Sequence, residues 1–278
     1  MEFSGLDLWT VIAGIIIVFF FGLASFKAKI VDYSGLIAGI LVGLSVFIIP
    51  EYGWKWFIVL LIFHLVAGQF TKYKYEAKRK TGVAQEKGGA RAWPNVLANG
   101  AIAAIMALSE GIFGGKIFLA GFLGAIGTAT SDTLATEVGL LNPKPPRLIT
   151  KLSKKVPAGT SGGVSPLGEL ATLFGSFVIG ASAWLLYLGG PLFEWNSSKL
   201  VLVALIAGTV GCTFDSILGA TIQGLYRCSA CNKITDNRKH CGKTSRHIKG
   251  MEWLDNNLVN FLSAIVGAFT AMLIFLII

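Results

Sequence analysis

Long apolar stretches separated by short polar segments dominate the sequence. An α-helix needs about 20 mostly apolar residues to cross the hydrocarbon core of a bilayer. Eight stretches approach or exceed this length, namely residues 6–26, 33–49, 54–70, 92–108, 117–140, 164–188, 200–225 and 258–278. No linker divides them. The pattern therefore predicts an all-α integral membrane protein with about eight transmembrane helices in one polytopic domain, residues 1–278.

Composition supports this prediction. Charged residues make up 14% of the chain and hydrophobic residues 54%, whereas soluble domains carry roughly 25% charged residues. Acidic Glu2 lies before the first apolar stretch and acidic Asp7 at its start, and Lys27 and Lys29 follow it, which is the reverse of a secretory signal peptide. We therefore expect the first stretch to remain as a helix.

The basic residues alternate between the connections. Two of the 24 Lys and Arg residues follow the first stretch, and seven, five and seven lie within residues 72–91, 144–155 and 227–249; the other three are Lys55, Lys116 and Lys199. The positive-inside rule then predicts that the basic connections are cytosolic and that both termini lie outside. The net charge of +9 is read as a topology signal that also attracts anionic lipids and phosphates, and not as a sign of nucleic-acid binding.

Polar residues within the apolar stretches gather near the basic connections. Ionisable groups inside a membrane are costly and are functional-site candidates by default. The predicted candidates are Asn95, Asn99, Asp132, Thr133, Glu137, Ser165, Glu169, Asp215, Ser216, Gln223, Asn256, Asn257 and Asn260. We therefore expect the active face to be the cytosolic one.

Helical spacing groups these residues. Steps of four place Asn95 with Asn99, and Asn256 with Asn260, on one helix face each. The same step joins Asp215, Gly219 and Gln223. Glu137 follows Asp132 by five residues, or about 140° around a helix. The two acids meet only if the helix unwinds; otherwise they face different neighbours.

The acids Asp132, Glu137 and Asp215 suit a cation. Mg²⁺ prefers hard oxygen ligands, with water and phosphate completing its octahedron. The same acids could bind protons or Na⁺ in a transporter. We also note a weak internal echo, in which residues 124–127 precede Asp132 as residues 208–211 precede Asp215. It indicates either an internal parallel repeat or chance similarity between glycine-rich helices.

The connection before the sixth stretch is rich in phosphate-binding features. Small residues before a helix let several backbone N–H groups point at one anion, and basic residues add countercharge. The residues are Arg147, Lys151, Lys154, Lys155, Gly159, Thr160, Ser161, Gly162, Gly163 and Ser165. No Gly-Lys-Ser/Thr follows, so this is not a Walker motif. The alternative is a flexible glycine turn that caps the helix. Arg91, before the fourth stretch, is a further phosphate candidate.

Four cysteines form two groups. Cys212 stands alone in an apolar stretch, where packing is its expected role. Cys228, Cys231, His240 and Cys241 resemble a small zinc knuckle in the predicted cytosolic loop 226–250, with His247 as a rival ligand. Four protein ligands would leave no position open for substrate, so a zinc ion there would order the loop.

Several blocks resemble one widespread membrane family. They are residues 91–100, 131–139, 146–150, 157–165, 215–223 and 256–260, which together span almost the whole chain. The family was long catalogued as a domain of unknown function and includes plant phytyl-phosphate kinase. The resemblance implies a kinase that passes a phosphoryl group from a nucleoside triphosphate, CTP in the plant case, to an isoprenoid monophosphate.

The implied roles fit the residues described above. Asp132, Glu137 and Asp215 would hold Mg²⁺. Arg147 and the glycine-rich loop, residues 159–163, would bind phosphates, and the apolar tail would lie between helices. An ion-coupled transporter or lipid flippase is the alternative from another class, although transporter sites usually lie near the membrane midplane. A CTP-dependent lipid nucleotidyltransferase would use similar ligands and would release pyrophosphate.

Overall fold

The computed structural model describes residues 8–49, 52–81, 87–187 and 198–278, most of which are helical. The helices are α1 (Leu8–Lys27), α2 (Tyr33–Phe47), α3 (Gly53–Lys72), α4 (Tyr75–Thr81), α5 (Trp93–Phe113), α6 (Lys116–Gly139), α7 (Pro166–Tyr187), α8 (Ser198–Thr221) and α9 (Asn256–Ile277). The predicted helix start at Leu6 and helix end at Leu188 lie outside the described residues.

The long helices confirm an integral, multi-pass membrane protein. Within the described residues, seven helices are long and apolar enough to cross a membrane: α1, α3, α5, α6, α7, α8 and α9. The predicted second helix forms as α2, but it has 15 residues. It therefore rises only about 22 Å, less than the hydrocarbon core of about 30 Å. Asp32 begins α2 because its carboxylate accepts a hydrogen bond from Gly35 N at 3.0 Å.

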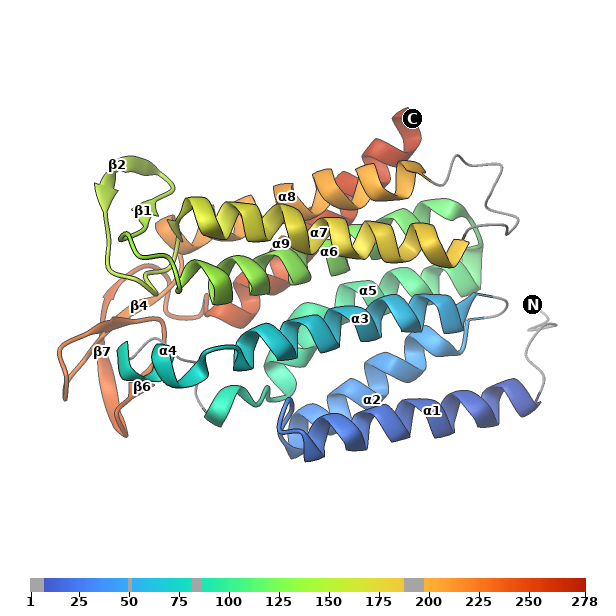
Figure 1. Ribbon diagram of the computed structural model, residues 1–278, viewed down its shortest axis with the longest axis horizontal. Helices are drawn as coiled ribbons and strands as arrows, with labels where there is room; N and C mark the ends of the chain where they lie inside the picture. Colours follow the sequence, from blue (N-terminus) through green and yellow to red (C-terminus); the bar gives the residue numbers. More distant parts are fainter. Residues whose placement is uncertain (1–7, 50–51, 82–86, 188–197) are drawn as a thin grey trace.

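The helices run along the long axis of the molecule, and the connections gather at its two ends (Figure 1). Helix α4, the turn between α1 and α2 and the strands between α6 and α7 and between α8 and α9 lie at one end, which we call the basic end. The start of α1 and the C-terminus lie at the other end. All four connections predicted to be basic thus share one end. Their cytosolic location, the outside location of the termini and the parallel repeat stay predictions.

Two small antiparallel sheets occupy the basic end. One contains β1 (Arg147–Leu148), β2 (Lys151–Lys155) and β3 (Gly163–Val164) in the order β2-β1-β3. The other contains β4 (Leu225–Cys228), β5 (Ile234–Thr235), β6 (Lys239–His240) and β7 (Lys243–Lys249) in the order β5-β4-β7-β6. The sequence analysis predicted neither sheet.

Helix boundaries differ modestly from those predicted. The seventh predicted helix was expected to continue to Leu225, but α8 ends at Thr221. The reason is that the backbone N–H of Met251 donates to Ile222 O and that of Gly224 donates to Leu254 O, which draws this segment away from the helix. Helix α5 instead extends beyond the predicted end at residue 108, to Phe113.

Helix α6 lies at the centre of the bundle and packs against α3, α5, α7, α8 and α9. Small residues permit this. A methyl group added at Gly124 would lie 2.2 Å from Gly267 O of α9, and one added at Gly208 of α8 would lie 3.0 Å from the carbonyl carbon of Gly127. Such close backbone approach is typical of packed membrane helices. The packing fixes how the polar ends of α6, α8 and α9 face one another.

Candidate active site at the basic end of the bundle

Two aspartates from different helices meet near the basic end. The carboxyl groups of Asp132 on α6 and Asp215 on α8 lie side by side. Ser263 of α9 lies beside Asp215, and its Oγ donates to Val259 O at 2.8 Å. With its amide nitrogen turned inward, Asn260 donates to Asp215 Oδ2 at 3.2 Å and to Asn256 O at 2.9 Å. Three helices thus bring oxygen-rich side chains to one point.

Glu137 faces a different neighbour. Helix α6 stays regular through both of its acids, so Glu137 points away from Asp132, as the spacing allows. Its carboxylate forms an ion pair with Lys78 of α4, with Nζ and Oε2 2.5 Å apart and both side chains buried. Lys78 also donates to Phe70 O and Thr71 O at 3.0 Å each. It thereby binds the last carbonyl groups of α3 as well as Glu137.

The three predicted magnesium ligands are therefore divided. Asp132 and Asp215 are together, and Glu137 is apart from them. Among the described residues, only the Cys/His cluster brings three or more potential metal-ligand atoms close together. The three acids do not form such a group. A cation held by the two aspartates would need water, substrate or amide oxygens to complete its shell.

Arg91 stands beside the acids of α6. It lies within electrostatic reach of Glu137 and Asp132. Its Nη1 donates to Asn95 Oδ1 at 2.8 Å, and Asn99 Nδ2 donates to Asn95 O at 2.8 Å. The predicted shared face of Asn95 and Asn99 thus becomes a chain of polar contacts that holds the guanidinium in place. Arg91 is half-buried and is fixed through its backbone, whose N–H donates to Ile30 O at 2.9 Å.

The glycine-rich loop packs against α8. Gly162 adopts φ +73°, and a methyl group there would lie 2.5 Å from Ala220 N. A methyl group at Gly219 would lie 2.9 Å from Gly162 N. Since Gly219 follows Asp215 by one helical turn, the loop reaches the segment of α8 directly beyond the aspartate pair. These glycines are required for this contact, because a side chain at either position would separate the loop from the helix.

An unsatisfied donor stands at this junction. Gln223 is 2% exposed, and its Nε2 has no hydrogen-bond partner among the described residues. Its Oε1 lies 3.2 Å from where a methyl group on Gly219 would be. A buried amide without a partner is destabilising by roughly 1–3 kcal/mol. A bound ligand that accepted from Nε2 would remove this penalty.

The remaining predicted site residues either hydrogen-bond within their own loop or helix end or differ in their burial. Ser165 caps α7, because Gly168 N donates to its Oγ at 3.1 Å. Arg147 is exposed, and its Nη1 donates to Leu152 O at 2.6 Å. Thr160 Oγ1 donates to Pro157 O at 2.7 Å. Of the rest, Thr133 is buried, Ser161, Gly163, Ser216 and Asn257 are half-buried, and Lys151, Gly159, Glu169 and Asn256 are exposed.

The structure adds residues that the sequence analysis missed. Ser263 follows Asn256 and Asn260 at positions i+7 and i+3, so the same face of α9 could have been extended to include it. Lys78 offered no such signal, because it is one of seven basic residues between residues 72 and 91. Its burial depends on contacts with distant parts of the chain.

The predicted Cys/His cluster also forms. The ligand atoms of Cys228, Cys231, His240 and Cys241 all lie within 4.8 Å of one another. Tetrahedral zinc with Zn–S bonds of about 2.3 Å requires sulfur atoms about 3.8 Å apart. The Cys₃His cluster can therefore bind a metal such as zinc. The rival ligand His247 instead lies with Nδ1 3.6 Å from Glu252 Oε1.

The local backbone favours a metal-binding thiolate. The N–H of Cys231 and then the His240 side chain hydrogen-bond to Cys228 Sγ and lower the pKa of this thiol to about 6, against the opposing effect of desolvation. Thiolates are the form of cysteine that binds metals. Cys212 is buried in α8, with Sγ 3.5 Å from Thr172 Oγ1, in agreement with its predicted packing role.

Comparisons with known proteins place this architecture in a family. A family model described as integral membrane protein DUF92 matches residues 16–268. Protein PGR of Arabidopsis thaliana is 34% identical over 263 residues, which cover 88% of this chain and 89% of that protein. Uncharacterized membrane protein MJ0933 of Methanocaldococcus jannaschii is 30% identical over 250 residues, 90% of this chain and 87% of that protein.

Protein VTE6, chloroplastic, also of Arabidopsis thaliana, is 29% identical over 245 residues, which cover 86% of this chain and 64% of that protein. No solved structure shows significant similarity to the chain. The matches confirm the family resemblance that was inferred from the sequence blocks. The chain belongs to the integral membrane protein family DUF92.

Proposed function

We propose that the chain is a Mg²⁺-dependent isoprenoid-phosphate kinase. Its substrates would be an isoprenoid monophosphate of the phytyl or geranylgeranyl type and a nucleoside triphosphate, with CTP as the first candidate. The observation that carries the proposal is the contact between Asp132 and Asp215, at the same end of the bundle as Arg91 and the glycine-rich loop. The resemblance to the family that includes plant phytyl-phosphate kinase supplies the reaction type.

The reaction needs no nucleophile from the protein. An oxygen of the isoprenoid monophosphate attacks the γ-phosphorus of the nucleotide, and a new P–O bond forms. The bond between this phosphorus and the β–γ bridging oxygen breaks, and the nucleoside diphosphate leaves with the electron pair. Such phosphoryl transfer depends on positioning and on neutralising phosphate charge. Arg91 and the glycine-rich loop would position the two phosphate groups.

Mg²⁺ would neutralise phosphate charge and align the reacting groups. Two neighbouring carboxylates repel each other unless a proton or a cation lies between them, and their oxygens are the ligand type that Mg²⁺ prefers. We therefore assign the ion to Asp132 and Asp215. Glu137 would have to leave Lys78 to join them, so we assign it a positioning role through α4.

Gln223 supports a ligand beside the glycine-rich loop. Its unpartnered Nε2 lies next to Gly219, which contacts the loop at Gly162. A phosphate oxygen is a strong acceptor for such a donor. We assign this junction to the phosphates of the nucleotide. The basic end would face the cytosol, where nucleotides are available, in accordance with the positive-inside rule.

The position of the acids favours an enzyme over a transporter. Asp132 lies in the last two turns of α6 and Asp215 in the last two turns of α8. Both therefore lie on the basic side of the midpoint of their helix. Transporters usually bind their substrate at the midplane, with access from both sides.

We also propose that Cys228, Cys231, His240 and Cys241 hold a structural zinc ion. Their four ligand atoms form a closed set, which is typical of structural rather than catalytic zinc. The cluster lies in the connection between α8 and α9, where Lys249 Nζ donates to Ala220 O at 2.9 Å. Zinc would stabilise this connection and so fix the position of Asp215 on α8 relative to Asn260 on α9.

Product analysis tests the kinase proposal. Purified protein in lipid would be incubated with geranylgeranyl or phytyl monophosphate, Mg²⁺ and each of CTP, ATP, GTP and UTP. The expected products are the isoprenoid diphosphate and a nucleoside diphosphate, identified by mass spectrometry. A nucleotidyl-lipid with pyrophosphate would establish the nucleotidyltransferase instead. No turnover by folded protein with any nucleotide would contradict the proposal.

A further inference from the structure

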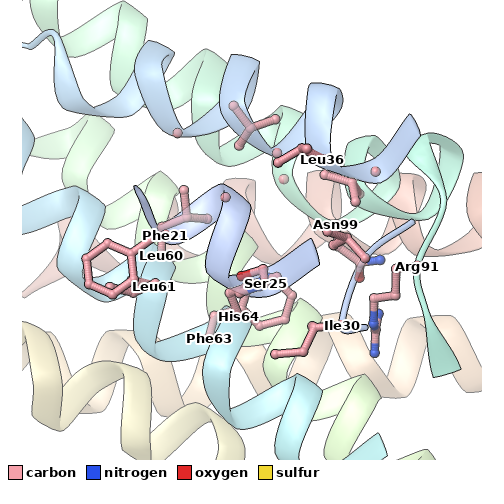
Figure 2. Close-up of a pocket in the computed structure, with 18 of the residues that line it drawn as sticks. Phe21, Ser25, Ile30, Leu36, Leu60, Leu61, Phe63, His64, Arg91 and Asn99 are labelled. Carbon is pink, nitrogen blue, oxygen red and sulfur yellow. Dashed lines mark hydrogen bonds between the residues drawn. The ribbon is translucent and has the colours of Figure 1, made fainter. Parts of the chain in front are cut away.

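An apolar cavity of about 100 Å³ opens between α1, α2, α3 and the start of α5. Its walls include Val18 and Phe21 of α1, Val42 of α2 and Phe57 and Leu60 of α3. Figure 2 shows Phe21, Leu60 and Leu61 toward one side of the view, and Arg91 and Asn99 toward the other. The cavity therefore extends from the basic end into the apolar interior of the bundle.

The polar groups of this cavity are unevenly distributed. Arg91, Asn95 and Asn99 lie together at the basic end. Farther inside, Ser25 Oγ and His64 Nε2 lie 2.8 Å apart and satisfy each other through a hydrogen bond. The inner walls otherwise consist mainly of aliphatic and aromatic side chains and glycine. A fixed positive charge at the entrance of an apolar cavity suits an amphiphile with an anionic head and a hydrocarbon tail.

We propose that this cavity binds the isoprenoid tail next to the phosphate, and that Arg91 binds the phosphate itself. The inference rests on the proposed kinase function, for which it names the lipid-binding site. Arg91 connects the two sites, since it lines the cavity and also lies within electrostatic reach of Asp132. A phosphate held by Arg91 would face the aspartate pair, while its tail would lie between α1, α2 and α3.

Gly39 offers a direct test. It lines the cavity on α2, and an added methyl group there would meet no atom within 4 Å. An added methyl group at this position would therefore displace no wall, and larger side chains would fill more of the cavity. Gly111 of α5 is a matched control, because it is an exposed helical glycine whose added methyl group would lie 3.9 Å from Ile49.

We expect graded effects from Gly39→Ala, Gly39→Val and Gly39→Leu. KM for geranylgeranyl monophosphate should rise with side-chain size, by about tenfold or more for Gly39→Leu, while KM for the nucleotide stays within about twofold. Gly111→Leu should leave both values unchanged. Gly39→Ala adds only one methyl group in open space, so we expect it to fold. Its KM for the lipid can therefore be measured even if the larger variants do not fold. Equal KM values for the lipid across a folded series would overturn the inference.

Photo-crosslinking separates this inference from the kinase proposal. A geranylgeranyl monophosphate with a diazirine near the phosphate would be irradiated with the protein in lipid, without nucleotide, and the labelled peptides would be identified. Labelling of α1, α2 and α3 that Gly39→Leu abolishes and Gly111→Leu preserves supports the cavity, even if no nucleotide supports turnover. Labelling confined to other helices overturns the cavity assignment, even if the kinase reaction is observed.

Discussion

Lys78 Nζ lies 2.5 Å from Glu137 Oε2, and the two side chains are 1% and 3% exposed. The pair joins a short helix at the basic end to the most central helix of the bundle. Because Lys78 also binds two carbonyl groups at the end of α3, one side chain connects α3, α4 and α6. A buried pair of this kind fixes the geometry around Arg91 and Asp132.

Removing one partner of this pair should destabilise the protein. Glu137→Gln or Lys78→Met would leave one buried charge without its partner, at a cost of about 3–5 kcal/mol in the free energy of unfolding. The double variant Lys78→Met/Glu137→Leu should recover much of this loss. Unfolding in detergent or lipid measures the effect. The control is Glu76→Gln, because Glu76 forms an exposed pair with Arg79 at 3.4 Å that contributes less than about 1 kcal/mol.

The same double variant assigns the role of Glu137. If Glu137 only positions α4, folded Lys78→Met/Glu137→Leu protein should keep measurable kinase activity and an unchanged dependence on Mg²⁺. If Glu137 is a metal ligand, as the sequence predicted, the Mg²⁺ concentration for half-maximal activity should rise sharply. The latter result would show that Glu137 leaves Lys78 during the reaction.

Asp132→Asn and Asp215→Asn should each abolish most of the activity. Replacing a carboxylate with an amide removes charge from the proposed metal site and changes its size little. We expect kcat to fall by roughly 10²-fold or more, and the Mg²⁺ requirement to increase. Full activity in either correctly folded variant would contradict the site, and Glu76→Gln again serves as the control.

Zinc analysis should find one metal ion per chain. Cys231→Ser and Cys241→Ser should lose it, whereas Cys212→Ser and His247→Asn should retain it, because neither Cys212 nor His247 belongs to the cluster. Elemental analysis measures the zinc, and the absorption spectrum of a cobalt-substituted sample reports the thiolate ligands. Equal zinc content in Cys231→Ser and the unaltered protein would exclude this cluster.

Labelling in sealed vesicles should place Lys151 and Lys199 on opposite sides of the membrane. Lys151 is exposed on β2 at the basic end, and Lys199 is at the start of α8, where it donates to the carbonyl oxygen of Ile278. A membrane-impermeant amine reagent applied from one side should modify only one of them, as detected by mass spectrometry. Modification of both in intact vesicles would contradict the topology.

The helical framework could be predicted from sequence because its causes are local. Apolar length identifies a membrane helix, and the alternation of basic residues tests each assignment. The small sheets and α4 could not be found in this way. All five residues of β2 are exposed, so no alternation of apolar and polar residues marks it as a strand. Strands β1, β3, β4, β5 and β6 have only two to four residues and are stabilised by their partners.

The site was predictable where helical spacing determined it. The step of four correctly grouped Asn95 with Asn99, because the Asn99 side chain donates a hydrogen bond to the backbone carbonyl of Asn95. It also correctly placed Gly219 beside Gln223. The partner of Glu137 was not predictable, since Lys78 is 59 residues away in the chain. Such a pair depends on how α4 folds against α6, and no periodicity encodes it.

The central position of α6 has a consequence for biogenesis. It is the most buried and least hydrophobic of the seven membrane-spanning candidates, and it carries Asp132 and Glu137. A nascent helix of this kind partitions poorly into lipid on its own. We therefore expect α6 to remain in the protein-lined path of the insertion machinery until neighbouring helices can shield it. Truncated chains that end shortly after Gly139 should consequently integrate less efficiently than chains that also contain α7, α8 and α9.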